Sequence, residues 1–334
     1  MELTIKELNL YRPLVFDYKS DNVILNKDIT FDVDEIKMKI DLFLEECDKV
    51  YNSNKGKYEK YYYKIHTNKN DTNINDAQLY SLRDGIQFLT FMIGSYNDSL
   101  WYTIAKIIGF EVALDDICIP HGDVENGKFK YIGETLKDLF DRIKGNGDQR
   151  WLNLAYNDIL YGSKIQFYEK LGVEDNEFPN YISWYLQQEN LLEASFIRNW
   201  DAITIGGLAL ISYYCNISYD NCDWKLFYIS CVGQILGTDV SKTFNKIVSK
   251  CPTDFVKNNE RFNSIVTLYS KITELYNKPL TLETPIFKRY AFVSISYADN
   301  LDRYLERRNM ARLPILKSIQ EIIDTIETIR NNSE

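Results

Sequence analysis

The sequence predicts an all-α protein in which a bundle of helices surrounds a central apolar cavity. Three observations predict this class. Glycine and proline are scarce, with 15 and 7 residues in a chain of 334. Apolar residues recur mostly at helical spacing, and no segment shows the alternation of a half-buried strand. Several helical segments are apolar on more than one side and therefore need burial on more than one side, as in a bundle with a central layer or cavity.

The first predicted helix covers residues 31–51, and its spacing places five apolar residues on one broad face: Ile36, Ile40, Leu42, Phe43 and Val50. Polar residues, rich in Asn, Lys and Tyr, follow at 52–75 and predict a loop. Helical spacing resumes at residues 76–95 and 97–118. Each of these two segments opens with a residue type that is favoured at a helix N-cap, Asp76 and Asn97. The remaining predicted helices cover residues 131–144, 148–171, 181–197, 201–214, 224–251, 259–276, 285–308 and 313–331.

Breaks between these helices also follow from residue type. Pro120 and two nearby glycines mark a loop before residue 131, and Pro252 ends the long apolar helix at 224–251. Pro285 and Pro314 stand near helix starts, where proline is tolerated. No repeat and no Pro/Gly-rich linker divides the chain, so residues 1–334 are predicted to form a single domain.

Composition excludes several classes of function. Hydrophobic residues make up 45% and charged residues 26%, as in soluble globular proteins. No apolar run approaches 18 residues and the first residues lack a secretory pattern, so we expect a cytoplasmic protein without stable membrane insertion. A net charge of −9 repels nucleic acid, which is not expected as a partner. Two histidines and six cysteines without a C-x-x-C pair leave carboxylates, amides and arginines to carry any chemistry.

An aspartate pair, Asp115-Asp116, ends the apolar helix predicted at 97–118. The negative end of the helix dipole lies there, so two anions are disfavoured unless something positive offsets them. Oxygen ligands suit Mg²⁺, which is the natural candidate. The alternative for such a pair is a solvated helix end.

At this point the sequence resembles the class I terpene synthases, which ionise an isoprenoid diphosphate with Mg²⁺, and among them the compact trichodiene-synthase-like type. The family carries D-D-x-x-(x)-D/E at the end of an apolar helix lining a cavity, and VALDDICIP matches its position and its paired aspartates. Ile119 and Pro120 stand where a third acid is expected, and Asp123 follows in the loop. The resemblance implies a cavity in a helical bundle and three Mg²⁺ ions per active site.

A second match is SFIRNWDAITIGGLAL, where the family has a diphosphate-sensing arginine followed by a helix break. It supplies Arg198, Asp201, Ala202 and Gly206. An arginine suits bidentate phosphate recognition. The resemblance implies that Asp201 orients it and that small residues let a backbone carbonyl approach the ligand. The alternative is a surface arginine paired with Asp201.

Near the C-terminus, Arg303-Tyr304 matches the family's Arg-Tyr pair, which hydrogen-bonds the diphosphate. Tyr297 lies two turns earlier on the same predicted helix and could face the cavity. Ile108 and Val112, one turn or more before the aspartates, are candidate cavity walls, although residues of this kind, Tyr297 included, are more often plain core.

The family's second metal motif, (N/D)-D-x-x-(S/T)-x-x-(K)-E, is incomplete here. Its i, i+4, i+8 spacing brings three oxygen ligands onto one helical face. Asp239 and Thr243 fill two positions in the favoured register, with Ile247 in the third. Asn245 and Ser249 fill two in the alternative register, which Pro252 ends before a third ligand.

The resemblance implies a Mg²⁺-dependent cyclase, a lyase of isoprenoid biosynthesis, that converts a prenyl diphosphate and releases diphosphate. Farnesyl diphosphate is favoured over geranylgeranyl diphosphate. A prenyl transferase is an alternative that normally carries two full aspartate-rich motifs. A helical binding protein that has lost activity is another. The protein is expected as a monomer or a homodimer.

Overall fold

The computed structural model describes residues 32–66, 73–94, 98–188, 191–244 and 286–291. Within these ranges the chain is built from helices, and extended structure is limited to two isolated bridges, Ile65–Ile117 and Tyr131–Glu134. The predicted all-α class is therefore confirmed. No described helix combines the length and apolar character that crossing a membrane requires.

The helices vary from single turns to α8, which spans seven turns. In chain order they are α2 (Val33–Ser53), α3 (Lys55–Tyr58), η1 (Glu59–Tyr61), α4 (Ile74–Ile93), α5 (Ser99–Asp116), α6 (His121–Glu125), α7 (Leu136–Ile143), α8 (Gln149–Glu174), α9 (Tyr181–Leu186), α10 (Leu191–Asp201), α11 (Thr204–Tyr214) and α12 (Trp224–Phe244). Residues 286–291 are also helical.

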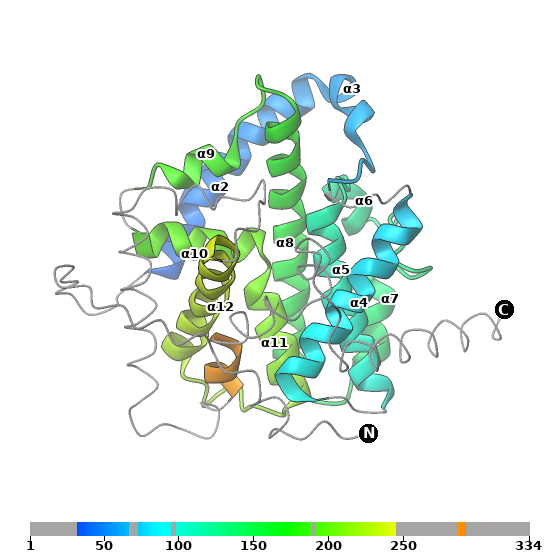
Figure 1. Cartoon of the computed structure of the whole chain (residues 1–334), viewed down its shortest axis with the longest axis vertical. Helices are drawn as coiled ribbons and strands as arrows, with labels where there is room; N and C mark the ends of the chain where they lie inside the picture. Colours follow the sequence, from blue (N-terminus) through cyan, green and yellow to red (C-terminus); the bar gives the residue numbers. More distant parts are fainter. Residues whose placement is uncertain (1–31, 67–72, 95–97, 189–190, 245–285, 292–334) are drawn as a thin grey trace.

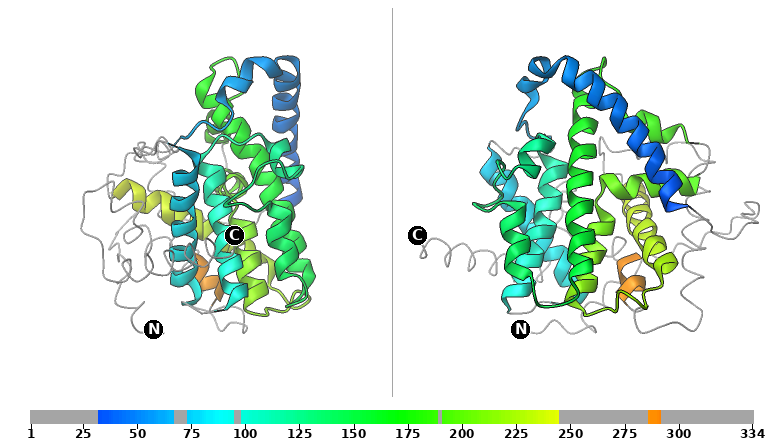
Figure 2. Two further views of the ribbon diagram at one scale, coloured as in Figure 1. Left: turned by 90° about the vertical axis from the view of Figure 1, so that its right-hand side faces the viewer. Right: turned by 180° about the vertical axis from the view of Figure 1, so that it is seen from behind.

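The long helix α8 stands in the middle of the described structure (Figure 1). The pair α4 and α5 lies on one side of it, with α10 and α12 on the other, and the views of Figure 2 agree with this arrangement. Helix α11 packs along α8, and α12 packs on both α10 and α11. Helix α8 also contacts both α5, which carries the aspartate pair, and α10, which carries Arg198.

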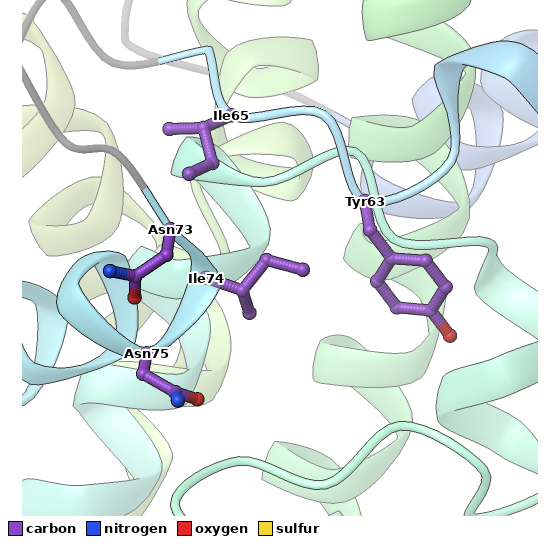
Figure 3. A pocket seen from close by; sticks show the side chains of 5 residues that line it. All are labelled: Tyr63, Ile65, Asn73, Ile74 and Asn75. Atoms are coloured by element: carbon purple, nitrogen blue, oxygen red, sulfur yellow. The ribbon is translucent and has the colours of Figure 1, made fainter.

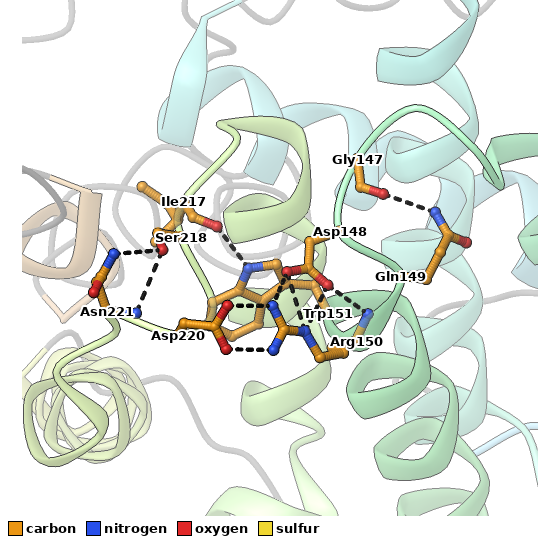
Figure 4. A network of polar contacts seen from close by, with 9 residues as sticks. All are labelled: Gly147, Asp148, Gln149, Arg150, Trp151, Ile217, Ser218, Asp220 and Asn221. Atoms are coloured by element: carbon orange, nitrogen blue, oxygen red, sulfur yellow. Dashed lines mark hydrogen bonds and ion pairs between the residues drawn. The ribbon is translucent and has the colours of Figure 1, made fainter.

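The first turn of α8 is tied to the turn between α11 and α12 by an exposed polar network (Figure 4). The Arg150 guanidinium donates to Asp148 at 2.6 Å and to Asp220 at 2.8 Å. Beneath it, the Trp151 indole donates to the Ile217 carbonyl at 2.9 Å. Trp151 is fully buried, so packing and not surface charge is the main source of stability at this end of α8.

Most predicted helices are confirmed to within a few residues, but several predictions were wrong. Leu42, predicted on the apolar face of the first helix, is 59% exposed. Residues 181–197 do not form one helix, because α9 ends at Leu186 and α10 begins at Leu191. The helix predicted at 131–144 begins only at Leu136, where Thr135 and Asp138 form a capping box. The predicted loop at 52–75 includes the short helices α3 and η1, and the loop predicted before residue 131 includes α6. The predicted helices at 259–276 and 313–331 lie outside the described residues, as do residues 245–251 of the helix predicted at 224–251 and residues 292–308 of the helix predicted at 285–308.

Candidate active site

The aspartate pair lies at the last turn of α5, as predicted, but its two side chains have different environments. Asp115 is exposed, whereas Asp116 is 3% exposed. The chain leaves the helix at Ile117 in an extended conformation. A short bridge holds this exit: the His66 N–H donates to the Asp116 carbonyl at 2.8 Å, and the Cys118 N–H donates to the Lys64 carbonyl at 2.9 Å. The structure thus presents Asp115 to solvent at a fixed helix end.

The loop after this helix end does not bring a third acid to the pair. Ile119, at the position of the missing acid, is 2% exposed and belongs to the core. Asp123 accepts a hydrogen bond from the Tyr63 hydroxyl at 2.5 Å and pairs with Lys128 at 3.2 Å. Both contacts of Asp123 stabilise the loop, so Asp123 has a structural role.

A pocket of about 430 Å³ opens beside this loop, between Tyr63 and Ile65 on one side and the start of α4 on the other (Figure 3). Its other lining residues are Asn73, Ile74 and Asn75. None of the five lining residues is charged, so the pocket lacks the groups that would bind a diphosphate. The charged site lies elsewhere, between α5, α8 and α10.

A buried lysine that the sequence analysis missed lies under the end of α5. Lys170 of α8 is 3% exposed, and its ammonium group donates to the Leu114 carbonyl at 2.7 Å. A cation at a helix C-terminus is favoured by the helix dipole. Lys170 therefore supplies part of the positive charge that two adjacent aspartates need, a role that the sequence had suggested for metal alone.

The helix break predicted after Arg198 is present. Helix α10 ends at Asp201, Ile203 has φ +54° and ψ +33°, and α11 begins at Thr204. This left-handed conformation is unfavourable for a β-branched residue and needs support from its surroundings. Gly162 of α8 gives that support, because a Cβ there would lie 2.5 Å from the Ile203 side chain. The close approach of α8 thus holds the break.

The break between α10 and α11 also explains why a carboxylate, that of Asp158, is buried beside it. Ile203 offers no side-chain cap to α11, and Asp158 of α8 instead accepts the Gly206 N–H at 2.7 Å. Burial raises the pKa of Asp158 to about 8. Glu111, one turn before Asp115, lies close enough to Asp158 that burial and the neighbouring carboxylate both raise its pKa. Glu111 and Asp158 form an acidic pair beneath the break.

Arg198 and Asp201 form a buried ion pair one helical turn apart. Their side chains are 8% and 2% exposed, and Nη1 of Arg198 donates to Oδ2 of Asp201 at 2.5 Å. The predicted partnership is therefore present, and its burial excludes the alternative of a surface pair. Burial raises the pKa of Asp201, and the guanidinium opposes that rise.

Glu169 of α8 joins this pair and connects it to the aspartates of α5. Burial raises the pKa of Glu169 to about 8, and the negative charge of neighbouring Asp201 contributes to that rise. The charge of Asp115 also raises the pKa values of both Glu169 and Asp201. Asp115 and the Arg198–Asp201 pair, far apart in the sequence, are therefore electrostatic neighbours at one end of α8.

The structure describes some of the other predicted site residues and leaves the rest outside the described ranges. Ile108 is buried and Val112 is half-buried on α5, and Ala202 is half-buried at the break. Asp239 and Thr243 lie one turn apart in α12, of which the backbone alone is described at these positions. The remaining predicted residues, Asn245, Ser249, Tyr297, Arg303 and Tyr304, lie outside the described residues.

Magnesium fits the donors at the end of α5. Among the described residues, no three His, Cys, Asp or Glu side chains gather closely enough to hold a metal by themselves. Mg²⁺ does not need such a cage, since it is usually bound by one or two carboxylates together with phosphate oxygens and water. The exposed Asp115 carboxylate, next to Asp116 and near a guanidinium, is suited to that mode.

Comparison with known proteins identifies the family. A family model described as alpha-humulene synthase matches residues 71–334. An alpha-humulene synthase from Phoma sp is 23% identical over 268 residues, covering 78% of this chain and 67% of the relative. An alpha-humulene synthase from Sarocladium schorii is 22% identical over 319 residues, covering 87% of this chain and 66% of the relative. The chain thus spans about two-thirds of the length of these relatives. Together with the all-α fold, the match over most of the sequence establishes that the chain belongs to the alpha-humulene synthase family of class I terpene synthases.

Proposed function

We propose that the protein is a Mg²⁺-dependent terpene cyclase that ionises farnesyl diphosphate, closes the hydrocarbon chain and releases diphosphate. The observation that carries the proposal is the convergence of Asp115 with the Arg198–Asp201 pair at one end of α8. The two relatives, both alpha-humulene synthases by name, support a sesquiterpene product. A single domain, a cytoplasmic location and a monomeric or homodimeric state remain predictions from the sequence.

In this proposal Asp115 and Asp116 would hold the metal, with Asp239 and Thr243 as the favoured second ligand set. Bound Mg²⁺ would withdraw charge from the diphosphate and so favour its departure. The number of ions, three by resemblance, is part of the proposal. Asp115 is already exposed at a fixed helix end, so it can accept a ligand without rearrangement of the core.

Arg198 would donate to the departing diphosphate, because a guanidinium fork matches two phosphate oxygens. Asp201 holds the guanidinium in place, so little side-chain entropy is lost when the ligand arrives. Ala202 lies at the break, where the chain has left the α-helix and a backbone carbonyl can turn toward the ligand. Arg303 and Tyr304 are proposed to complete the anion site.

The apolar walls would protect the carbocation that ionisation leaves behind. Ile108 and Val112 lie on α5 one to two turns from the aspartates, and the hydrocarbon chain is proposed to extend along them. A dry wall prevents water from trapping the cation.

Product analysis tests the proposal. Purified protein is incubated with geranyl, farnesyl or geranylgeranyl diphosphate, with and without Mg²⁺, and extracts are separated by gas chromatography with mass detection. We expect a cyclic C15 hydrocarbon only in the reaction that contains both farnesyl diphosphate and Mg²⁺. A product joining two prenyl chains would favour a prenyl transferase, and binding without turnover would favour a protein that has lost activity.

A further inference from the structure

A continuous hydrogen-bonded chain, the α8 relay, connects the ends of α5 and α10 through Lys170 and Gln166. The Lys170 ammonium donates to the Leu114 carbonyl at 2.7 Å and to Oε1 of Gln166 at 2.7 Å. Nε2 of Gln166 then donates to the Asp201 carbonyl. Both relay side chains are 3% exposed. Two side chains of α8, one helical turn apart, thus hold one backbone carbonyl of α5 and one of α10.

Each end of the relay satisfies a carbonyl at a helix terminus. The last carbonyls of an α-helix have no partner within the helix. The Cys118 N–H, which would otherwise follow the helix back toward Leu114, donates to Lys64 instead. Asp201 is the last residue of α10, where the chain turns through the left-handed Ile203. The relay therefore holds the two positions at which the chain departs from helical structure beside the site.

Lys170 differs from a simple helix cap because it brings a positive charge into the core. All three ammonium protons have oxygen acceptors, the third being the Gln166 carbonyl at 3.3 Å. Within the described residues none of these acceptors is a carboxylate, so the charge is offset by the negative end of α5 and by nearby acidic side chains. A buried ammonium is costly unless it is hydrogen-bonded and its charge is offset, so the contacts of Lys170 favour one fixed position for the end of α5.

We propose that Lys170 and Gln166 are positioning residues that couple metal binding at the α5 aspartates to diphosphate binding at Arg198. The proposal rests on the function proposed above. One end of the relay is bonded to Leu114, directly before Asp115, and the other to Asp201, which holds Arg198. A ligand that fixes one end therefore reduces the freedom of the other.

Coupling of this kind is measurable because it is reciprocal. If Mg²⁺ tightens diphosphate binding by some factor, diphosphate must tighten Mg²⁺ binding by the same factor, and typical factors are about 5 to 150. Losing either relay residue should lower the factor by about fivefold or more. Because both residues belong to one chain of contacts, losing both should lower it no further than losing one.

The test is calorimetric titration of the full chain with inorganic diphosphate, in EDTA and at several fixed Mg²⁺ concentrations. Complex formation between Mg²⁺ and diphosphate in solution is identical for every variant and cancels in the comparison. The relay variants are Gln166→Leu, Lys170→Met and their double. We expect affinity in EDTA to stay within about twofold of wild type while the Mg²⁺-dependent gain falls.

Matched controls separate coupling from general loss of stability. Gln78→Leu removes a buried amide that donates to the Lys130 carbonyl at 3.2 Å and accepts the Ile132 N–H at 2.7 Å. Lys106→Met removes an ammonium that donates to the Ile132 carbonyl at 3.2 Å and pairs with Glu134. Both act away from the break, so they should lower the melting temperature yet keep the full coupling factor. If Gln166→Leu does not fold, Lys170→Met alone decides the outcome.

Three results are distinguishable. A reduced factor in the relay variants, unchanged in the controls and equal in single and double variants, supports the inference. A wild-type factor in folded relay variants overturns it, as does an equal loss in the controls. If wild type itself gains no diphosphate affinity from Mg²⁺, the proposed function fails rather than the relay.

Discussion

Replacing Arg198 with methionine should make the stability of the protein depend steeply on pH. The substitution removes the guanidinium that lies 2.5 Å from Asp201 and leaves that carboxylate, 2% exposed, beside Glu169. Removing one partner of a buried pair typically costs about 3–5 kcal/mol, because the remaining charge has lost its counter-ion. We expect a loss of that size at pH 8.

The loss should shrink in acid. Without the guanidinium, the pKa of Asp201 in the folded state rises further above its unfolded value, so the folded state binds more protons. Stability is then highest below the unfolded pKa of about 4, and it falls by about 1.4 kcal/mol per pH unit as pH rises toward the folded pKa. At pH 5, three pH units lower, the expected loss is therefore no more than about 1 kcal/mol.

Urea unfolding at pH 5, 6.5 and 8, followed by circular dichroism, measures this difference. Arg150→Met is the matched control, because it also removes an arginine from two carboxylates but does so on the surface (Figure 4). Its effect should be much smaller and without the same slope. Asp201→Asn in the Arg198→Met background should recover most of the loss. A loss that is the same at pH 5 and pH 8 would refute the reasoning.

Three further outcomes are expected. Gly162→Ala should destabilise the protein by about 1–3 kcal/mol in urea titrations, since the new methyl group meets the helix break, whereas Gly56→Ala, with no atom within 4 Å, should not. Wild-type stability should fall between about pH 4 and pH 8, because the folded-state pKa of Asp158 is raised to about 8, and Asp158→Asn should reduce that slope by about 1.4 kcal/mol per pH unit. In steady-state rates across a Mg²⁺ titration, Asp239→Asn should be damaging and Asn245→Ala mild if the favoured metal register is used; the reverse pattern would establish the other register.

Local patterns predicted most helices, since apolar spacing and N-cap residues act within one segment. The prediction at 181–197 failed because apolar spacing on both sides of the polar run from Gln187 to Asn190 is compatible with one continuous helix. Helix α11 begins at Thr204, three residues after the predicted start at Asp201, for another reason. Ile203 adopts a left-handed conformation only because Gly162, distant in sequence, lets α8 approach it.

The same distinction applies to the site. Asp115, Asp116, Arg198 and Asp201 belong to short motifs, so their sequence neighbours pointed to them. Lys170, Gln166 and Asp158 were missed because each resembles an ordinary polar residue of a helix. A signal was present: residues 158, 162, 166 and 170 recur every four positions, and all four are buried in α8. Their partners on α5 and α10 could not be known without the packing of the three helices.

The rate of diphosphate release from farnesyl diphosphate tests most directly whether the α5 aspartates and Arg198 serve one site. The comparison uses wild type, Asp115→Asn, Arg198→Lys and the double variant at saturating Mg²⁺, with Asp148→Asn of the exposed network as control. One shared site predicts that each single change slows release by about 100-fold or more, and that the double variant is far less impaired than the product of the two effects. Near-wild-type release from either single variant, or independent effects that multiply in the double variant, would contradict it.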